Sequence, residues 1–111
     1  MGTGSGEAAQ LGQLKLPVQF TPEADNELAE AVTYYRSISS ALSDRFLSEL
    51  DQAIDRICAH PVRYPPISDV ARKISVENFP YIIVFGFVTD GVVVYACFHT
   101  SRDPAIWQSR L

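Results

Sequence analysis

The spacing of apolar residues after Pro22 predicts an amphipathic helix in the first third of the chain. Apolar side chains recur there every three or four positions, which places them on one helical face. Thr21 can cap the helix, and Pro22 suits a first turn whose N–H groups have no partner. The expected buried stripe is Ala24, Leu28, Ala31, Val32 and Tyr35, and the expected solvent face carries Glu23, Glu27 and Glu30.

A second amphipathic helix is expected after the serine-rich stretch SISSALS (37–43), because serine side chains compete for the backbone hydrogen bonds of a helix. We expect it to begin at about Leu42 and to stop before Pro61. Its apolar stripe is Leu42, Phe46, Leu50, Ala53, Ile54 and Ile57. Two such helices with a short link predict a helical hairpin.

Four segments are predicted to be strands. A short one, LPVQF (16–20), precedes the helices; RKISVE (72–77), YIIVFGFV (81–88) and VVVYACFHT (92–100) follow them, and are rich in β-branched and aromatic residues. The proline-rich HPVRYPPISD (60–69) is the irregular crossing from helices to sheet. The turn TDG joins the last two strands, so the three later strands predict an antiparallel meander. The expected fold class is α+β, a helical hairpin packed on one face of a small antiparallel sheet in the order β-α-α-β-β-β.

Strict alternation in the last strand predicts which side chains face the helices. It places Val92, Val94, Ala96 and Phe98 under the helices, and Val93, Tyr95, Cys97 and His99 on the open face. The terminal segment DPAIWQSRL (103–111) is expected to form a short helical turn or tail in which Trp107 folds back on apolar surface.

Composition limits the chain to one domain. It has 111 residues, of which 47% are hydrophobic and 20% charged, which is enough for one core and too few for two. Residues 1–14 are rich in glycine and small residues and are expected to be a flexible tail, with a single domain at 15–111. No apolar run approaches the roughly 20 residues that span a bilayer, and no secretory signal is evident, so we expect a cytoplasmic protein without membrane contact. Cys58 and Cys97 lack the spacing of a zinc site, and both are expected to be buried thiols outside any disulfide.

Charge is unevenly distributed along the chain. Residues 17–59 carry eight acids against three arginines, a balance of −5, whereas residues 60–111 carry five cations against four acids, a balance of +1. The acidic half should repel nucleic acid, so any contact with a polyanion must come from residues 60–111. The electrostatic attraction of a polyanion to those residues would be weak.

Four segments together resemble a known toxin family: FTPEADNELAEAVTYY (20–35), HPVRYPP (60–66), NFPYIIVFGF (78–87) and VVVYACFHTSRDPAIW (92–107). In this order they resemble the RelE/ParE superfamily of type II toxin–antitoxin toxins, often called plasmid stabilisation proteins, over about residues 17–107. The resemblance implies a growth-inhibiting toxin held by a cognate antitoxin. It also implies a target, either DNA gyrase for ParE-like members or ribosome-bound messenger RNA for RelE-like members, and no cofactor or metal.

For a RelE-like nuclease, the resemblance places the chemistry on basic and proton-transferring residues of the sheet. Such a reaction needs charge neutralisation at the phosphoryl group, a base for the 2′-hydroxyl and an acid for the leaving oxygen. The candidates, which would be catalytic only in a nuclease, are Arg72, Lys73, Tyr81, His99 and Arg102. His99 and Arg102 have structural alternatives as well: a hydrogen-bonded strand end, and an ion pair with Asp103.

Two features favour the ParE-like reading. The sequence pI is about 5.0, whereas many RelE-like nucleases are strongly basic and end near a functional tyrosine. FHTSRDP (98–104) also resembles the closing strand of ParE-like members, where such residues are structural. We therefore expect an inhibitor that binds DNA gyrase; the alternatives are a ribosome-dependent endoribonuclease and a non-toxic binding protein of the same fold. A homodimer and a toxin–antitoxin hetero-oligomer both remain open.

Overall fold

The computed structural model describes residues 16–60 and 62–111. Its elements are β1 (Val18–Phe20), α2 (Pro22–Ile38), α3 (Ser40–Ala59), β2 (Arg72–Val76), β3 (Tyr81–Val88), β4 (Gly91–His99) and α4 (Ala105–Gln108). The predicted succession of a strand, a helical hairpin and three strands is confirmed. The expected tail at residues 1–14 lies outside the described residues.

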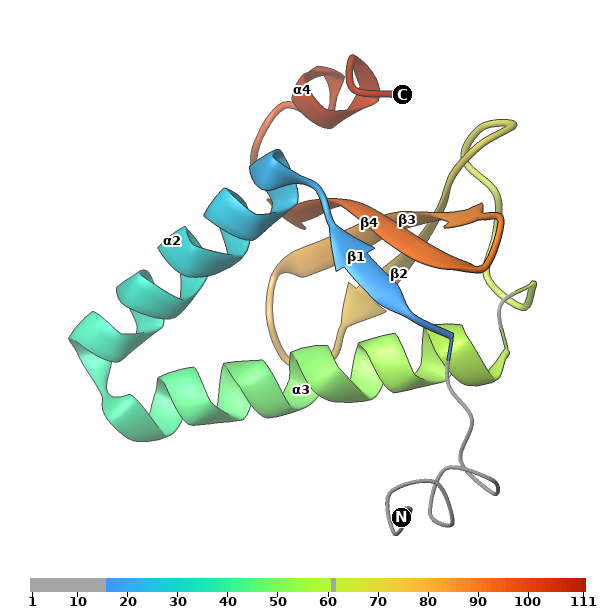
Figure 1. The fold of residues 1–111 in the computed structure, drawn as a ribbon. Coiled ribbons are helices and arrows are strands. Elements are labelled where there is room, and N and C mark those ends of the chain that lie inside the picture. The colour runs from blue at the N-terminus through green and yellow to red at the C-terminus, as the bar shows by residue number, and fades with distance from the viewer. Residues whose placement is uncertain (1–15, 61) are drawn as a thin grey trace, which may run out of the picture.

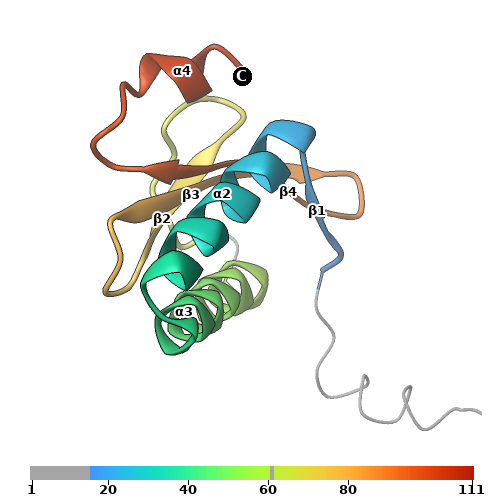
Figure 2. The same cartoon turned by 90° about the vertical axis from the view of Figure 1, so that its left-hand side faces the viewer.

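The sheet has four strands in the order β1-β4-β3-β2. Strands β2, β3 and β4 form the predicted antiparallel meander, and β1 joins β4 in parallel, so the sheet is mixed. Figures 1 and 2 show α2 and α3 on one face of the sheet and α4 beyond the other. The α+β class with a helical hairpin on a small sheet is confirmed.

Each long helix begins at a side-chain cap. The Thr21 hydroxyl accepts a hydrogen bond from the Ala24 N–H at 3.1 Å, as predicted. The Ser39 hydroxyl accepts one from the Leu42 N–H at 3.0 Å, so α3 begins at Ser40 rather than near Leu42. The expected break is therefore a single residue, because Ser39 both ends α2 and caps α3.

The main core lies between the helical hairpin and the sheet. From the helices it takes Ala24, Ala31, Tyr35, Phe46, Leu50, Ala53 and Ile57, which are the buried members of the two predicted stripes. From the sheet it takes Ile74, Val76, Ile83, Phe85, Val92, Val94 and Cys97. The periodicity of the two helices thus identified the apolar residues of their buried faces correctly, although Glu27 on α2 is buried as well.

The predicted alternation in β4 is wrong beyond Tyr95. Val94 pairs with Phe85, but Ala96 pairs with Val84, so a β-bulge leaves Tyr95 without a partner in the register. The extra residue reverses the faces that follow. Cys97 therefore joins the core under the helices, while Ala96 and Phe98 point to the opposite face.

A second, smaller core covers the face of the sheet that the long helices leave open. Trp107 of α4 folds back onto it, as predicted, and is 6% exposed. The cluster consists of Ala71, Val84, Ala96, Phe98 and Trp107, with Ile67, Ile82 and Tyr95 packed against it. The C-terminal segment is therefore an integral layer of the fold.

Candidate functional site

A buried carboxylate, Glu27, joins α2, β4 and the C-terminal segment. It is 8% exposed, which corrects the expectation that it faces solvent. The Arg110 guanidinium donates to both carboxylate oxygens, at 3.1 Å and 2.9 Å, in a forked arrangement. The backbone N–H of Cys97 donates to Glu27 Oε1 at 3.1 Å. One carboxylate therefore ties together three segments distant in sequence.

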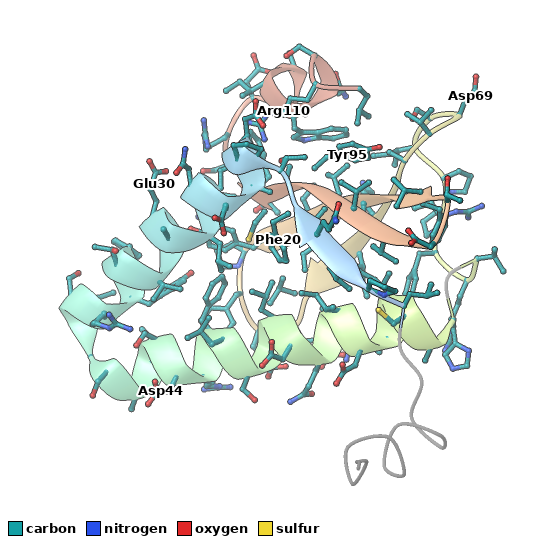
Figure 3. The ribbon with its side chains drawn as sticks, viewed as in Figure 1. Phe20, Glu30, Asp44, Asp69, Tyr95 and Arg110 are labelled. Atoms are coloured by element: carbon teal, nitrogen blue, oxygen red, sulfur yellow. The ribbon has the colours of Figure 1, made fainter. Side chains whose placement is uncertain are left out.

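Because the pairing of β1 with β4 ends early, the carboxylate has backbone groups of β4 to satisfy. Strand β1 pairs with β4 only as far as Val94, so the backbone groups beyond it lack a strand partner on that side. Glu27 accepts from the Cys97 N–H, while the Tyr95 carbonyl accepts from Arg110 at 3.2 Å and from the Thr21 hydroxyl at 3.3 Å. Figure 3 shows Arg110 beside the first turns of α2. The site satisfies backbone groups that the sheet leaves unpaired.

Burial and charge in this site shift two pKa values. The hydrogen bond from Arg110 to Glu27 raises the pKa of the guanidinium, which stays charged at all relevant pH. Burial, together with the negative charge of Glu27, raises the pKa of the Cys97 thiol to about 12. Cys97 is therefore a protonated, unreactive thiol. Its predicted burial is confirmed, whereas Cys58 is only half-buried.

Three of the five candidate catalytic residues line one hollow. Lys73, His99 and Arg102 surround a cavity of about 210 Å³, floored by Ile82, Phe98 and Trp107. Arg102 lies over the Phe98 ring, with its guanidinium carbon 4.6 Å from the ring centroid. Its Nη1 lies 3.6 Å from Glu27 Oε2. One cation of the hollow therefore already has a stacking partner and a carboxylate.

The hydrogen bonds of His99 limit the proton chemistry open to it. Its Nδ1 accepts from the Ser101 N–H at 3.1 Å and lies 2.8 Å from the Ser101 hydroxyl. Since an N–H donor requires an unprotonated Nδ1, the neutral ring carries its proton on Nε2. In this tautomer Nε2 can donate a hydrogen bond, but it cannot accept a proton from a substrate. The imidazole also packs edge-on against Tyr81, with centroids 5.1 Å apart.

Tyr81 belongs to the aromatic core under the helices. Its ring lies 5.2 Å from Phe46 and 6.2 Å from Tyr35. Burial, with the nearby Tyr35 as the next contribution, raises the pKa of the Tyr81 hydroxyl to about 12. A phenol with so high a pKa is a poor general base at neutral pH.

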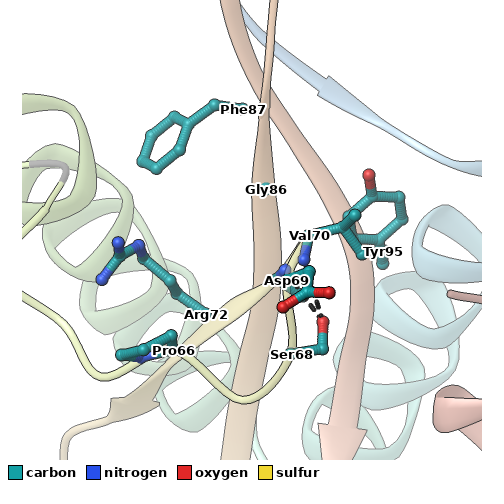
Figure 4. Close-up of a pocket in the computed structure, with 9 residues that line it drawn as sticks. Pro66, Ser68, Asp69, Val70, Arg72, Gly86, Phe87 and Tyr95 are labelled. Atoms are coloured by element: carbon teal, nitrogen blue, oxygen red, sulfur yellow. Dashed lines mark hydrogen bonds between the residues drawn. The ribbon is translucent and has the colours of Figure 1, made fainter.

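Arg72 lies apart from Lys73 because neighbouring strand residues point to opposite faces. Its guanidinium donates to the Tyr64 carbonyl at 2.6 Å. It lines a different hollow, of about 370 Å³, with Phe87, Gly86, Tyr95, Pro66 and residues 68–71. Figure 4 shows Arg72 and Phe87 on one side of β3 and Tyr95 on the other. The five candidates are therefore not gathered into one site.

Several aromatic side chains outside the two helix stripes are packed into the cores. Phe79 and Tyr64 pack against the main core, and Trp107 is buried in the second. On α2, Tyr34 is 59% exposed and Ile38 is 58% exposed. Within residues 16–60 and 62–111, no three metal-ligating side chains come together.

The sequence reading missed Glu27 and left the role of Arg110 open, although one signal was available. Glu27 follows Ala24 by three residues and precedes Ala31 by four, so it shares their buried face. An acid on such a face needs a buried partner, and Arg110 was one of the few cations in the second half. The bulge that gives Glu27 its backbone partner has no evident signal in the β4 sequence.

The fold defines a small α+β domain of the RelE/ParE type. The family model described as the ParE toxin of the type II toxin–antitoxin system parDE matches residues 18–104. The chain belongs to this ParE toxin family. No curated protein matches it.

A solved structure supports the same fold. A chain from the chromosomal ParDE toxin–antitoxin system of P. aeruginosa is similar over 78% of this chain and 98% of its own, with a TM-score of 0.66 and 10% identity. At this identity the likeness concerns the fold alone. In the described part of the chain, no helix is both long and apolar enough to cross a membrane.

Proposed function

We propose that this toxin inhibits growth by binding DNA gyrase, without cleaving RNA itself. Membership in the ParE toxin family carries this proposal. The arrangement of the candidate catalytic residues supports it, because they do not converge as a nuclease would require. A cleaving site needs a base, an acid and a cationic phosphate holder around one reacting atom.

Each part of such a site is compromised here. The acceptor nitrogen of His99 is occupied by Ser101, and the Tyr81 hydroxyl has a raised pKa of about 12. Arg102 lies near the Glu27 carboxylate, and Arg72 lines a separate hollow. Lys73 is an exposed cation of the hollow that Arg102 also lines. Inhibition by binding requires no general base, general acid or phosphate-binding cation.

The proposal includes a cognate antitoxin as partner, in keeping with the family and with the ParDE system of the structural neighbour. Antitoxin segments that fold on binding need large apolar burial to offset their ordering. The exposed Tyr34 and Ile38 on α2 offer such surface. Because the net charge is −4, simple attraction to an acidic partner cannot be the source of affinity, and we predict that the affinity for the antitoxin depends little on salt. A dissociation constant that weakens about a hundredfold from low to high salt would instead show that cations such as Arg63 and Lys73 dominate.

The test separates inhibition by binding from RNA cleavage. The chain is expressed without antitoxin, and growth, DNA breaks, the SOS response and message integrity are followed. We expect growth arrest with double-strand breaks, SOS induction and intact messages, and inhibition of purified gyrase in a supercoiling assay. His99→Ala should retain this inhibition. Cleavage of translated messages that disappears in His99→Ala would make the chain a nuclease, and no growth effect would make it a non-toxic binding protein.

A further inference from the structure

The outer edge of β2 is an unpaired strand edge. In the order β1-β4-β3-β2 this strand is last. On its outer side it forms a single isolated bridge, between Arg72 and Pro66. Beyond that bridge lie Lys73 to Val76, and the strand gives way at Asn78, whose φ of 69° turns the chain away. An open edge of this kind presents backbone donors and acceptors to another strand.

The sheet register shows which backbone groups point outward. The Cys97 N–H bonds Glu27 and therefore points away from β3, so Cys97 and Ile83 form a non-hydrogen-bonded pair. The backbone groups of Ile83 then point toward β2, where Ile83 pairs with Ile74. Since pairs alternate along an antiparallel ladder, the backbone N–H and C=O of Ser75 point away from β3, over the open edge.

The residues around Ser75 are complementary to a second copy of themselves. If two β2 strands pair in antiparallel fashion with the two-fold axis at Ser75, each Lys73 lies opposite Glu77 of the second copy. Ile74 then lies opposite Val76 of the second copy on the helix side. Lys73, Ser75 and Glu77 are exposed, and neither charged residue forms an ion pair among the described residues.

The free edge of β2 is long enough for this pairing but not for a longer one. Pro66 covers the edge at Arg72, and the turn at Asn78 ends it, so the free span is 73–77, with Ser75 at its centre. Beside this span is an open groove of about 360 Å³, lined by Arg56, Tyr64, Pro65, Lys73, Ile74, Ser75 and Glu77. An isologous two-fold contact requires a patch that matches itself, and this span does.

We propose that the chain forms a homodimer through antiparallel pairing of β2 with β2 of a second copy, centred on Ser75. The two Lys73–Glu77 pairs set the register, and the Ser75 backbone groups form the central hydrogen bonds. The contact is short and each copy carries a charge of −4, so the dimer is weak and reversible. This inference is independent of the proposed target.

Charge reversal tests the register. Sedimentation of the purified full chain over a concentration series should show a monomer–dimer equilibrium. Lys73→Glu and Glu77→Lys should each weaken the dimer by on the order of tenfold or more, because each turns two attractive cross-strand pairs into repulsive ones. The double variant Lys73→Glu/Glu77→Lys should restore it. Arg45→Glu and Asp51→Lys, on the exposed face of α3, make the same charge changes away from the edge and should leave the dimer unchanged.

Hydrogen exchange gives a second readout that needs no variant. The Ser75 amide should become protected as concentration rises, whereas the Ile74 amide, directed at β3, should be protected throughout. A chain that remains monomeric at about 1 mM overturns the proposal. So does a dimer that survives either single reversal, or protection of Ser75 that appears only when the protein encoded beside this gene is added.

Discussion

Removing the Glu27 carboxylate tests whether one buried charge holds the closing segment to the sheet. Glu27→Ala leaves the Arg110 guanidinium, whose side chain is 18% exposed, without its partner, and leaves the Cys97 N–H without an acceptor. Breaking a buried ion pair from one side costs about 3–5 kcal/mol; because Arg110 can recover some hydration, we expect about 3 kcal/mol. For a domain of this size that lowers Tm by about 10 °C.

Matched variants separate this effect from a general helix effect. Glu30→Ala removes an acid from the exposed face of the same helix, where Figure 3 shows it pointing outward, and should change stability by less than about 0.5 kcal/mol. Arg102→Ala loses a half-exposed ion pair and a contact with Phe98, and should cost about 1 kcal/mol. Chemical denaturation measures all three. If Glu27→Ala costs no more than Glu30→Ala, the carboxylate does not hold the segment.

Two further predictions concern the thiol and a close backbone contact. Because the pKa of Cys97 is raised to about 12 from an unfolded value near 9.0, the unfolded chain releases a proton above pH 9 that the native chain keeps. Stability should fall above that pH by up to about 1.4 kcal/mol per pH unit, and Cys97→Ala should flatten this decline in denaturation curves. Gly86→Ala places a methyl group 2.5 Å from the Val70 carbonyl oxygen and should cost about 1–3 kcal/mol by thermal unfolding, whereas Val88→Ala on the exposed end of β3 should cost less; equal losses would contradict the contact.

The helices could be predicted from sequence because their signals are local. The Thr21-Pro22 start, the three-and-four spacing and the proline-rich crossing each depend on neighbouring residues. The same locality produced the errors. Ser39 was read as a helix breaker, although a serine that ends one helix can cap the next. Glu27 was assigned to solvent because its partner, Arg110, lies 83 residues away.

The candidate site was harder to predict because its geometry depends on the sheet register. Arg72 and Lys73 are adjacent in sequence, yet strand geometry sends them to different hollows. Lys73 and Arg102 are distant in sequence, yet they line the same one. Residue type identified cations suited to bind phosphate, but which of these cations lie close together is decided by strand pairing.

The bulge at Tyr95 links the architecture of this domain to the charge of the hollow beside Lys73 and His99. Without the extra residue, Cys97 would face away from the helices, and its N–H would not meet Glu27 in the arrangement seen here. With it, the Glu27 carboxylate is drawn to β4, where it binds Arg110 and lies 3.6 Å from Arg102. The carboxylate therefore lowers the positive charge available in the hollow beside Lys73 and His99. The carboxylate that satisfies the backbone of β4 thus also reduces the positive charge of the surface on which a phosphoryl group would have to bind. This is consistent with a toxin that acts by contact.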